Sequence, residues 1–230
     1  MSKASATSAA LLALTVWLLP VHAHAEPGLH LRVGAVTNYL HRGVSQSDHE
    51  PALQASMEYQ GRRGFYVGVW TSEVAFAFDD RDYEVDYFAG HQRRWSENIA
   101  TDLTVVHYNY DMSPHGTNYD WSEGQFALHL GDRFTLLGAA AHNWLGRNTW
   151  SYVAEATIRQ PLARHWIAHA SLGRQLAKRA IDRSYTYFEI GVSRRLGPFD
   201  ISLSYADSSG LGGFGAAASS ELIAGIAMSN

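Results

Sequence analysis

The sequence predicts an all-β protein, a single antiparallel transmembrane β-barrel of about twelve strands, with about ten to fourteen strands compatible with the pattern. Apolar and polar residues alternate with period two along many segments. Short and long links alternate between these segments, as in a barrel with one plain and one elaborated end. After residue 25, no uninterrupted apolar run approaches the roughly 18 to 20 residues that a spanning helix needs.

The first residues are typical of a secretory leader. Lys3 precedes the uncharged run 9–19, which is followed by Pro20 and the small-x-small triplet at 23–25. An uncleaved membrane anchor is the alternative, but the run is shorter than a bilayer requires. We therefore predict a signal peptide at residues 1–25 and a barrel at residues 26–230, secreted through the inner membrane and located in the cell outer membrane.

Six candidate strands occupy the first half of the chain, near residues 29–41, 52–60, 64–72, 82–91, 98–110 and 120–130. Alternation of this kind gives a strand two unlike faces. It is clearest for Leu53, Ala55, Met57 and Tyr59 against Gln54, Ser56, Glu58 and Gln60, and for Tyr83, Val85, Tyr87 and Ala89 against Glu84, Asp86, Phe88 and Gly90.

Six more candidate strands lie near residues 133–144, 149–160, 164–175, 184–194, 199–206 and 219–229. The alternation is carried by Trp166, Ala168, Ala170 and Leu172 against Ile167, His169, Ser171 and Gly173, and by Phe199, Ile201, Leu203 and Tyr205 against Asp200, Ser202, Ser204 and Ala206. Around residues 136–141 both faces are apolar or small. Many of the twelve segments approach the roughly 9 to 11 residues that cross a bilayer at a tilt.

The links between the segments separate a membrane barrel from a soluble sandwich better than alternation does. Tight links at 61–63, 131–132, 161–163 and 196–198 take turns with longer ones near 42–51, 73–81, 111–119, 176–183 and 207–218. Two links fit less well: 91–97 is long for a tight turn, and 145–148 is short for a loop. Closure removes open sheet edges, whose unpaired backbone groups are costly in hydrocarbon.

Composition excludes several function classes. Charged residues are 17% of the chain, below the roughly 25% of soluble proteins. The chain has no cysteine, which excludes disulfides and thiolate metal sites. A net charge of −4 gives no basic surface for nucleic acid. Aromatic residues gather near predicted strand ends, where a membrane barrel carries its interfacial girdles: Tyr39, Tyr59, Phe65, Trp95, Tyr119, Trp121, Trp144, Trp150, Trp166 and Phe199.

If the apolar faces meet lipid, the opposite faces line a lumen in which acids predominate. Carboxylates in a pore favour cations, so we expect a weak cation preference. The candidate lumen and selectivity residues are Arg32, Arg42, Glu58, Glu84, Asp86, Asp102, Glu123, Glu155, Arg159 and Glu189. Alternatively, these acids pair with arginines, tyrosines or histidines across a narrow, filled barrel. For residues 42–51 we favour turn chemistry at the outer rim over a constriction formed by Arg42 and Asp48, because Gly43, Asp48 and Pro51 are turn formers.

The stretch 39–47, YLHRGVSQS, with PALQ at 51–54, resembles the early signature of the TorF-like porin family of Gram-negative bacteria. There an aromatic residue and an Arg-Gly pair lead to Ser-Gln and then Pro-x-x-Gln. GFYVGVW at 64–70 and EVDYFAG at 84–90 are further matches. The resemblance covers residues 35–90, and it implies an outer-membrane barrel that acts as a channel.

We therefore expect a passive diffusion channel for small solutes, with outer-membrane lipid and those solutes as its partners. The oligomeric state stays open. One alternative is a structural or adhesive barrel that does not conduct. Another is a barrel hydrolase or acyltransferase using His129, His142 or His169, although no nucleophile motif accompanies them. We expect no enzyme activity, no cofactor and no metal, because metal-ligand and nucleotide-binding motifs are missing from the sequence.

Overall fold

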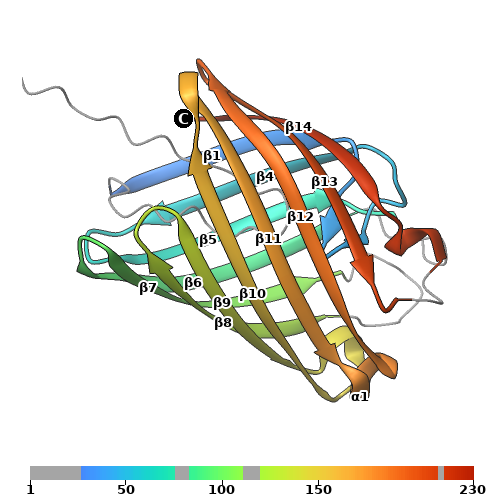
Figure 1. Ribbon diagram of the computed structural model, residues 1–230. Helices are drawn as coiled ribbons and strands as arrows, with labels where there is room; N and C mark the ends of the chain where they lie inside the picture. Colours follow the sequence, from blue (N-terminus) through green and yellow to red (C-terminus); the bar gives the residue numbers. More distant parts are fainter. Residues whose placement is uncertain (1–26, 76–82, 111–119, 212–214) are drawn as a thin grey trace, which may run out of the picture.

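The computed structural model describes residues 27–75, 83–110, 120–211 and 215–230. Its main body is a closed barrel in which all neighbouring strands are antiparallel (Figure 1). The twelve barrel strands are β1 (Gly28–Val36), β4 (Ala52–Gln60), β5 (Phe65–Glu73), β6 (Tyr83–Ser96), β7 (Ile99–Asn109), β8 (Trp121–Leu130), β9 (Phe134–His142), β10 (Trp150–Pro161), β11 (Trp166–Ala177), β12 (Arg183–Leu196), β13 (Phe199–Ser209) and β14 (Glu221–Ser229). The predicted fold class and strand number are confirmed.

Six short elements complete the described chain. The strands β2 (Leu40–His41) and β3 (Val44–Ser45) form a separate hairpin. The helix α1 (Lys178–Ile181) and the 3-10 turns Trp144–Gly146, Ala163–His165 and Gly215–Ala218 lie in links between barrel strands. None of the helices in these ranges is long and apolar enough to cross a bilayer.

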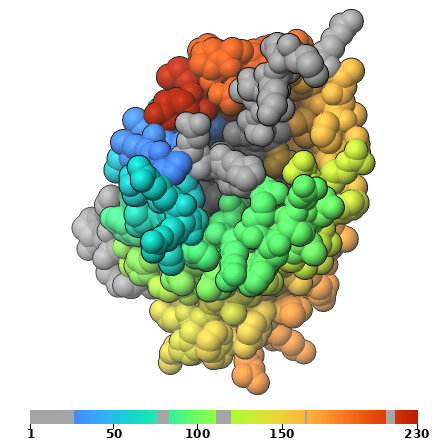
Figure 2. Space-filling model, turned by 90° about the vertical axis from the view of Figure 1, so that its left-hand side faces the viewer, coloured from blue at the N-terminus to red at the C-terminus, as the bar shows by residue number. Residues whose placement is uncertain are grey.

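The barrel closes where β14 pairs with β1, from Arg32 opposite Ser229 to Val36 opposite Gly225. The Asn230 side chain extends this seam, because its Oδ1 accepts from the Leu31 amide at 2.9 Å and its Nδ2 donates to the Leu29 carbonyl at 3.3 Å. Figure 2 looks onto the left-hand end of Figure 1, where red residues lie beside blue ones. Every barrel strand thus has two neighbours, which leaves no open sheet edge.

The alternation of the sequence becomes two faces of the barrel. On β6, Glu84 and Asp86 are buried, whereas Tyr83 and Tyr87 on either side of them are exposed. The same alternation leaves large apolar side chains such as Leu103 on the outer surface, with an exposed fraction of 59%. Burial on one face and apolar exposure on the other is the pattern of a barrel that meets lipid.

Two predicted boundaries are wrong. The predicted first strand, 29–41, ends at Val36, and residues 40–45 form the separate hairpin. The predicted link 91–97 is instead strand, because β6 runs to Ser96 with a register shift between Arg94 and Ser96. That irregularity lets one strand keep its pairing beyond a point where the period-two pattern fades.

The predicted aromatic girdle is partly wrong. Tyr59, Phe65, Trp95, Trp150 and Phe199 are exposed on the outside. Tyr39, Trp121 and Trp144 are buried within the molecule, and Trp166 is partly buried. Tyr119 and the predicted signal peptide at residues 1–25 lie outside the described residues.

Candidate functional site

The candidate functional site is the interior of the barrel, which we call the lumen, together with the hairpin β2–β3 folded into it. The hairpin turns at Arg42 and Gly43, whose φ angles are 51° and 75°. Two consecutive positive φ values are what a two-residue type I′ hairpin turn requires. The predicted turn chemistry is therefore present, but its placement at the outer rim is wrong, because Arg42 is completely buried. Asp48 is exposed in the following turn and forms no constriction with Arg42.

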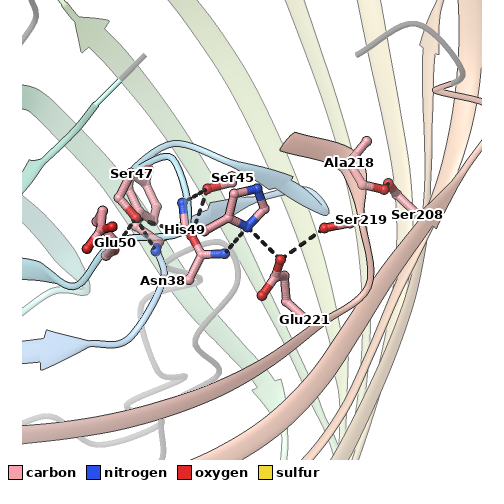
Figure 3. Close-up of polar contacts among 10 residues, drawn as sticks. Asn38, Ser45, Ser47, His49, Glu50, Ser208, Ala218, Ser219 and Glu221 are labelled. Carbon is pink, nitrogen blue, oxygen red and sulfur yellow. Dashed lines mark hydrogen bonds and ion pairs between the residues drawn. The ribbon is translucent and has the colours of Figure 1, made fainter. Parts of the chain in front are cut away.

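A polar network fixes the base of the hairpin (Figure 3). Asn38 Oδ1 accepts hydrogen bonds from Ser45 Oγ at 2.7 Å and Ser47 Oγ at 3.1 Å. His49 Nδ1 lies 2.5 Å from Glu221 Oε1, to which the Ser219 hydroxyl also donates at 3.0 Å. The contact ties the hairpin to the first residue of β14, so the hairpin has a defined position against the barrel wall.

Arg42 is the polar anchor of the hairpin. Its Nη1 and Nη2 donate to the two carboxylate oxygens of Glu123 on β8, at 2.9 and 2.5 Å. Nη1 also donates to Gln175 Oε1 on β11 at 3.3 Å. A forked guanidinium–carboxylate pair of this kind is strong and directional. Burial lowers the pKa of the adjacent His41 to about 3, with the charge of Arg42 as the second cause, so that imidazole is neutral at neutral pH.

The hairpin crosses the lumen from wall to wall. The Tyr39 ring meets Trp70 on β5 edge to face, with ring centroids 5.3 Å apart. At the tip, a Cβ added to Gly43 would lie 2.8 Å from Tyr187 Cβ on β12 and 3.0 Å from Ser208 Cβ on β13. Glycine is therefore needed at the tip both for its φ and for the close approach. The hairpin narrows the lumen between these walls.

Two acids on β6 face the hairpin. Glu84 is completely buried and accepts a hydrogen bond from the Tyr110 hydroxyl at 2.6 Å. Asp86, two residues further along the same face, is also buried, and its Oδ1 has no hydrogen-bond partner. Adjacent like charges disfavour each other's ionised form in a poorly solvated interior. Each acid of this pair has one oxygen without a hydrogen-bond partner, Oε2 of Glu84 and Oδ1 of Asp86.

The acids of β10 and β12 have protein partners. Glu155 accepts from the Tyr187 hydroxyl at 2.7 Å and from Thr157 Oγ1 at 3.3 Å. The Tyr187 ring lies over Gly173, where a Cβ would sit 2.1 Å from its Cζ. Glu189 Oε1 lies 3.2 Å from His169 Nε2. Gly173 on β11 therefore leaves room for Tyr187 of β12 to reach Glu155 of β10.

The remaining predicted lumen residues lie along the inner face. Asp102 accepts from the Tyr66 hydroxyl at 2.6 Å. Arg32 Nη1 donates to Asp200 Oδ2 at 3.4 Å. Glu58 is buried on β4, and Arg159 is partly buried on β10. The structure brings Arg42 and Glu123 together directly, while the others are spread around the barrel. Their role in ion selectivity stays a prediction.

The histidines considered for catalysis have a threonine, an acid and a tryptophan as described contacts, and Ser122 lies opposite His142 in the β8–β9 register. His129 Nδ1 lies 3.0 Å from Thr135 Oγ1, His169 contacts Glu189, and the exposed ring of His142 packs against Trp150. Within the described ranges, no group of three or more His, Cys, Asp or Glu side chains could hold a metal ion.

Sequence reasoning missed the tyrosines and Gln175 as lumen residues. Tyr185 and Tyr187 share the register of Glu189 in the sequence, so they belong to the inward face. The available signal was that these tyrosines alternate in step with Glu189, so they face the same side of the strand. Gln175 carried no comparable signal, because its contact with Arg42 depends on the infolded hairpin.

Residues 23–219 match the model of a family described as "Bacterial protein of unknown function (Gcw_chp)". No curated protein is significantly similar in sequence. A solved KdgM porin is similar with a TM-score of 0.55 and 5% identity, covering 86% of this chain and 98% of that chain. A KdgM porin in complex with disordered oligogalacturonate gives a TM-score of 0.57 and 6% identity, covering 87% and 97%.

At such low identity the likeness to the porins concerns the fold alone, and here it extends over nearly their whole length. The family match covers most of the sequence. The chain therefore belongs to the Gcw_chp family of bacterial proteins of unknown function.

Proposed function

We propose that the protein is an outer-membrane, porin-like passive diffusion channel for small solutes. The observation that carries the proposal is the contrast between the two faces of a closed barrel, with large apolar side chains outside and charged or hydrogen-bonding side chains inside. A polar lumen inside an apolar wall is the arrangement through which porins conduct. The porin fold of the solved neighbours and the resemblance of residues 35–90 to the TorF-like porin family support the same function.

The inner face favours small cations among these solutes. Buried acids on the barrel strands outnumber buried arginines, and Glu123 already neutralises Arg42. Glu84 and Asp86 lie on the same inward face beside the hairpin where the lumen is narrowed, and Asp86 Oδ1 has no hydrogen-bond partner. Carboxylates at a narrow point attract cations and exclude anions.

Single-channel recording in a planar bilayer tests the proposal. The refolded mature protein is expected to give discrete openings, with a reversal potential under a potassium chloride gradient that indicates cation preference. The double variant Glu84→Gln, Asp86→Asn is expected to shift that potential toward zero. Glu97→Gln, an exposed acid in the β6–β7 turn, is the matched control and is expected to leave it unchanged.

The hairpin favours one specific alternative. Because it spans the lumen from β5 to β12, the barrel also suits a non-conducting structural or adhesive role. Silence in the bilayer from a barrel that circular dichroism shows to be folded would reject the channel and favour this alternative. An outer-membrane hydrolase or acyltransferase has less support, because no nucleophile motif accompanies His129, His142 or His169 in the sequence.

A further inference from the structure

A cavity of about 60 Å³ lies in the lumen between the hairpin and the wall formed by β4–β9. Room for one water needs roughly 10–15 Å³ on this measure, so the cavity can hold a molecule of several non-hydrogen atoms. Its lining includes the aromatic residues Tyr66, Trp70, Phe88 and Tyr108. No lysine or arginine is among the lining residues.

Buried polar atoms in this lining lack partners. Asp86 is buried, and its Oδ1 has no hydrogen-bond partner. His129 is buried as well, and its Nε2 is equally unpaired. The His129 tautomer that donates from Nδ1 to Thr135 leaves a lone pair at Nε2. An unpaired buried polar atom is costly, so Asp86 Oδ1 indicates a missing hydrogen-bond donor. His129 lies at the other end of the cavity, because it is opposite Ala100 of β7, whereas Asp86 is opposite Tyr108 of the same strand.

The acids of the wall also favour a cation as the ligand. Asp86 and Asp102 both line the cavity, and Glu84 lies next to Asp86 on the inner face of β6. Tyr66 already donates to Asp102, whereas nothing donates to Asp86 Oδ1. Aromatic faces attract cations through their ring electrons, most strongly where water is excluded.

We propose that this cavity binds a small organic cation with a primary ammonium group, and that such ammonium compounds are the solutes of the channel. The ammonium N–H groups donate to Asp86 Oδ1, and the carbon atoms pack against the rings of Trp70 and Tyr108, which lie opposite Asp86 on the neighbouring strands β5 and β7. A primary ammonium fits better than a quaternary one, which has no N–H to donate. The assignment of these compounds as transported solutes rests on the proposed channel function.

Isothermal titration calorimetry on the full mature protein, refolded in detergent micelles, tests the site without requiring conduction. Methylammonium chloride, tetramethylammonium chloride and sodium chloride are titrated at matched ionic strength. Saturable binding of methylammonium, at least tenfold tighter than that of tetramethylammonium or sodium, is expected. Equal or tighter binding of tetramethylammonium, or no saturable methylammonium binding by a folded barrel, would overturn the proposal.

Variants assign the binding to the cavity. Asp86→Asn keeps the shape of the side chain and is expected to weaken methylammonium binding at least tenfold. Phe88→Leu removes one ring and is expected to weaken it about two- to fivefold. Asp200→Asn, a buried acid on β13 outside the cavity lining, is the matched control and is expected to stay within twofold of wild type. If Asp86→Asn folds and binds methylammonium as tightly as wild type does, the proposed site is wrong.

The bilayer recordings separate the two proposals. Binding by a protein that is silent in the bilayer keeps the ammonium site and rejects the channel. Conduction without methylammonium binding keeps the channel and rejects the site. Conduction with binding, and a methylammonium permeability reduced in Asp86→Asn, supports both.

Discussion

Glu155 on β10 and Asp86 on β6 occupy equivalent inward positions in the barrel, yet their surroundings differ. Both carboxylate oxygens of Glu155 accept hydrogen bonds, from Tyr187 and Thr157. One oxygen of Asp86 is unbonded and lines a cavity. The difference arises on neighbouring strands, where Gly173 lets the Tyr187 ring reach Glu155. The state of a lumen acid is thus set by what the adjacent strands bring to it, and inward orientation alone does not determine it.

Arg42→Met is expected to cause the largest loss of stability among the substitutions considered below. The change leaves Glu123 buried without its cation, which costs about 3–5 kcal/mol. Urea unfolding of the protein in lipid vesicles measures this loss. The double variant Arg42→Met, Glu123→Leu is expected to recover most of it, because no unpaired charge then remains. A loss below about 1 kcal/mol in the single variant would contradict the anchoring role of Arg42.

Gly43→Ala tests the hairpin tip through its shape, with no change of charge. Alanine at a positive φ is strained by about 1–3 kcal/mol, and its Cβ would also lie 2.8 Å from Tyr187 Cβ. We expect the tip to withdraw from β12 and single-channel conductance to rise. Gly131→Ala is the matched control, because Gly131 has a φ of 60° and nothing within 4 Å of an added Cβ. Equal conductance in both variants would show that the tip does not narrow the path.

Glu155→Leu tests the acid whose two carboxylate oxygens both accept hydrogen bonds. The Tyr187 hydroxyl loses its acceptor while it stays buried, which is expected to destabilise the barrel by about 1–3 kcal/mol in urea unfolding. Adding Tyr187→Phe removes the unpaired hydroxyl, and part of the stability should return. If the double variant is no more stable than the single one, the hydrogen bond is not the cause of the loss.

Asp86→Asn is expected to have the smallest effect on stability and the opposite sign. It removes one of two neighbouring buried acids, and Asp86 Oδ1 accepts no hydrogen bond that the change would break, so stability should stay equal or rise by up to about 1 kcal/mol. The same urea titration measures it. A destabilisation as large as that of Glu155→Leu would show that Asp86 and Glu155 do not differ in hydrogen bonding as proposed.

Much of the fold could be predicted because the barrel repeats one simple rule along the chain. Alternation fixes which side chains face inward, and closure follows from the cost of open edges. The strand near 52–60 was predicted at its observed bounds. The first strand was predicted too long because Tyr39 and Leu40 continue an apolar pattern, although these residues pack inside the lumen.

The candidate site was predictable only as a set of residues on one face. The acids follow from register, but their partners do not. Arg42 meets Glu123 through a turn that folds inward, and no local pattern separates a turn at the rim from a turn within the lumen. Trp121 shows the same limit, because an aromatic residue at a strand end suits either an outer girdle or the buried stack that it forms with Tyr108.

The hairpin has a consequence for the order of assembly. Arg42 precedes Glu123 by 81 residues and Gln175 by 133 residues, so the chain makes the hairpin long before the walls that hold it. Contacts between residues so distant in sequence form late, after the loss of chain entropy that loop closure demands. The contacts that hold Arg42 therefore cannot be complete until both β8 and β11 are in place.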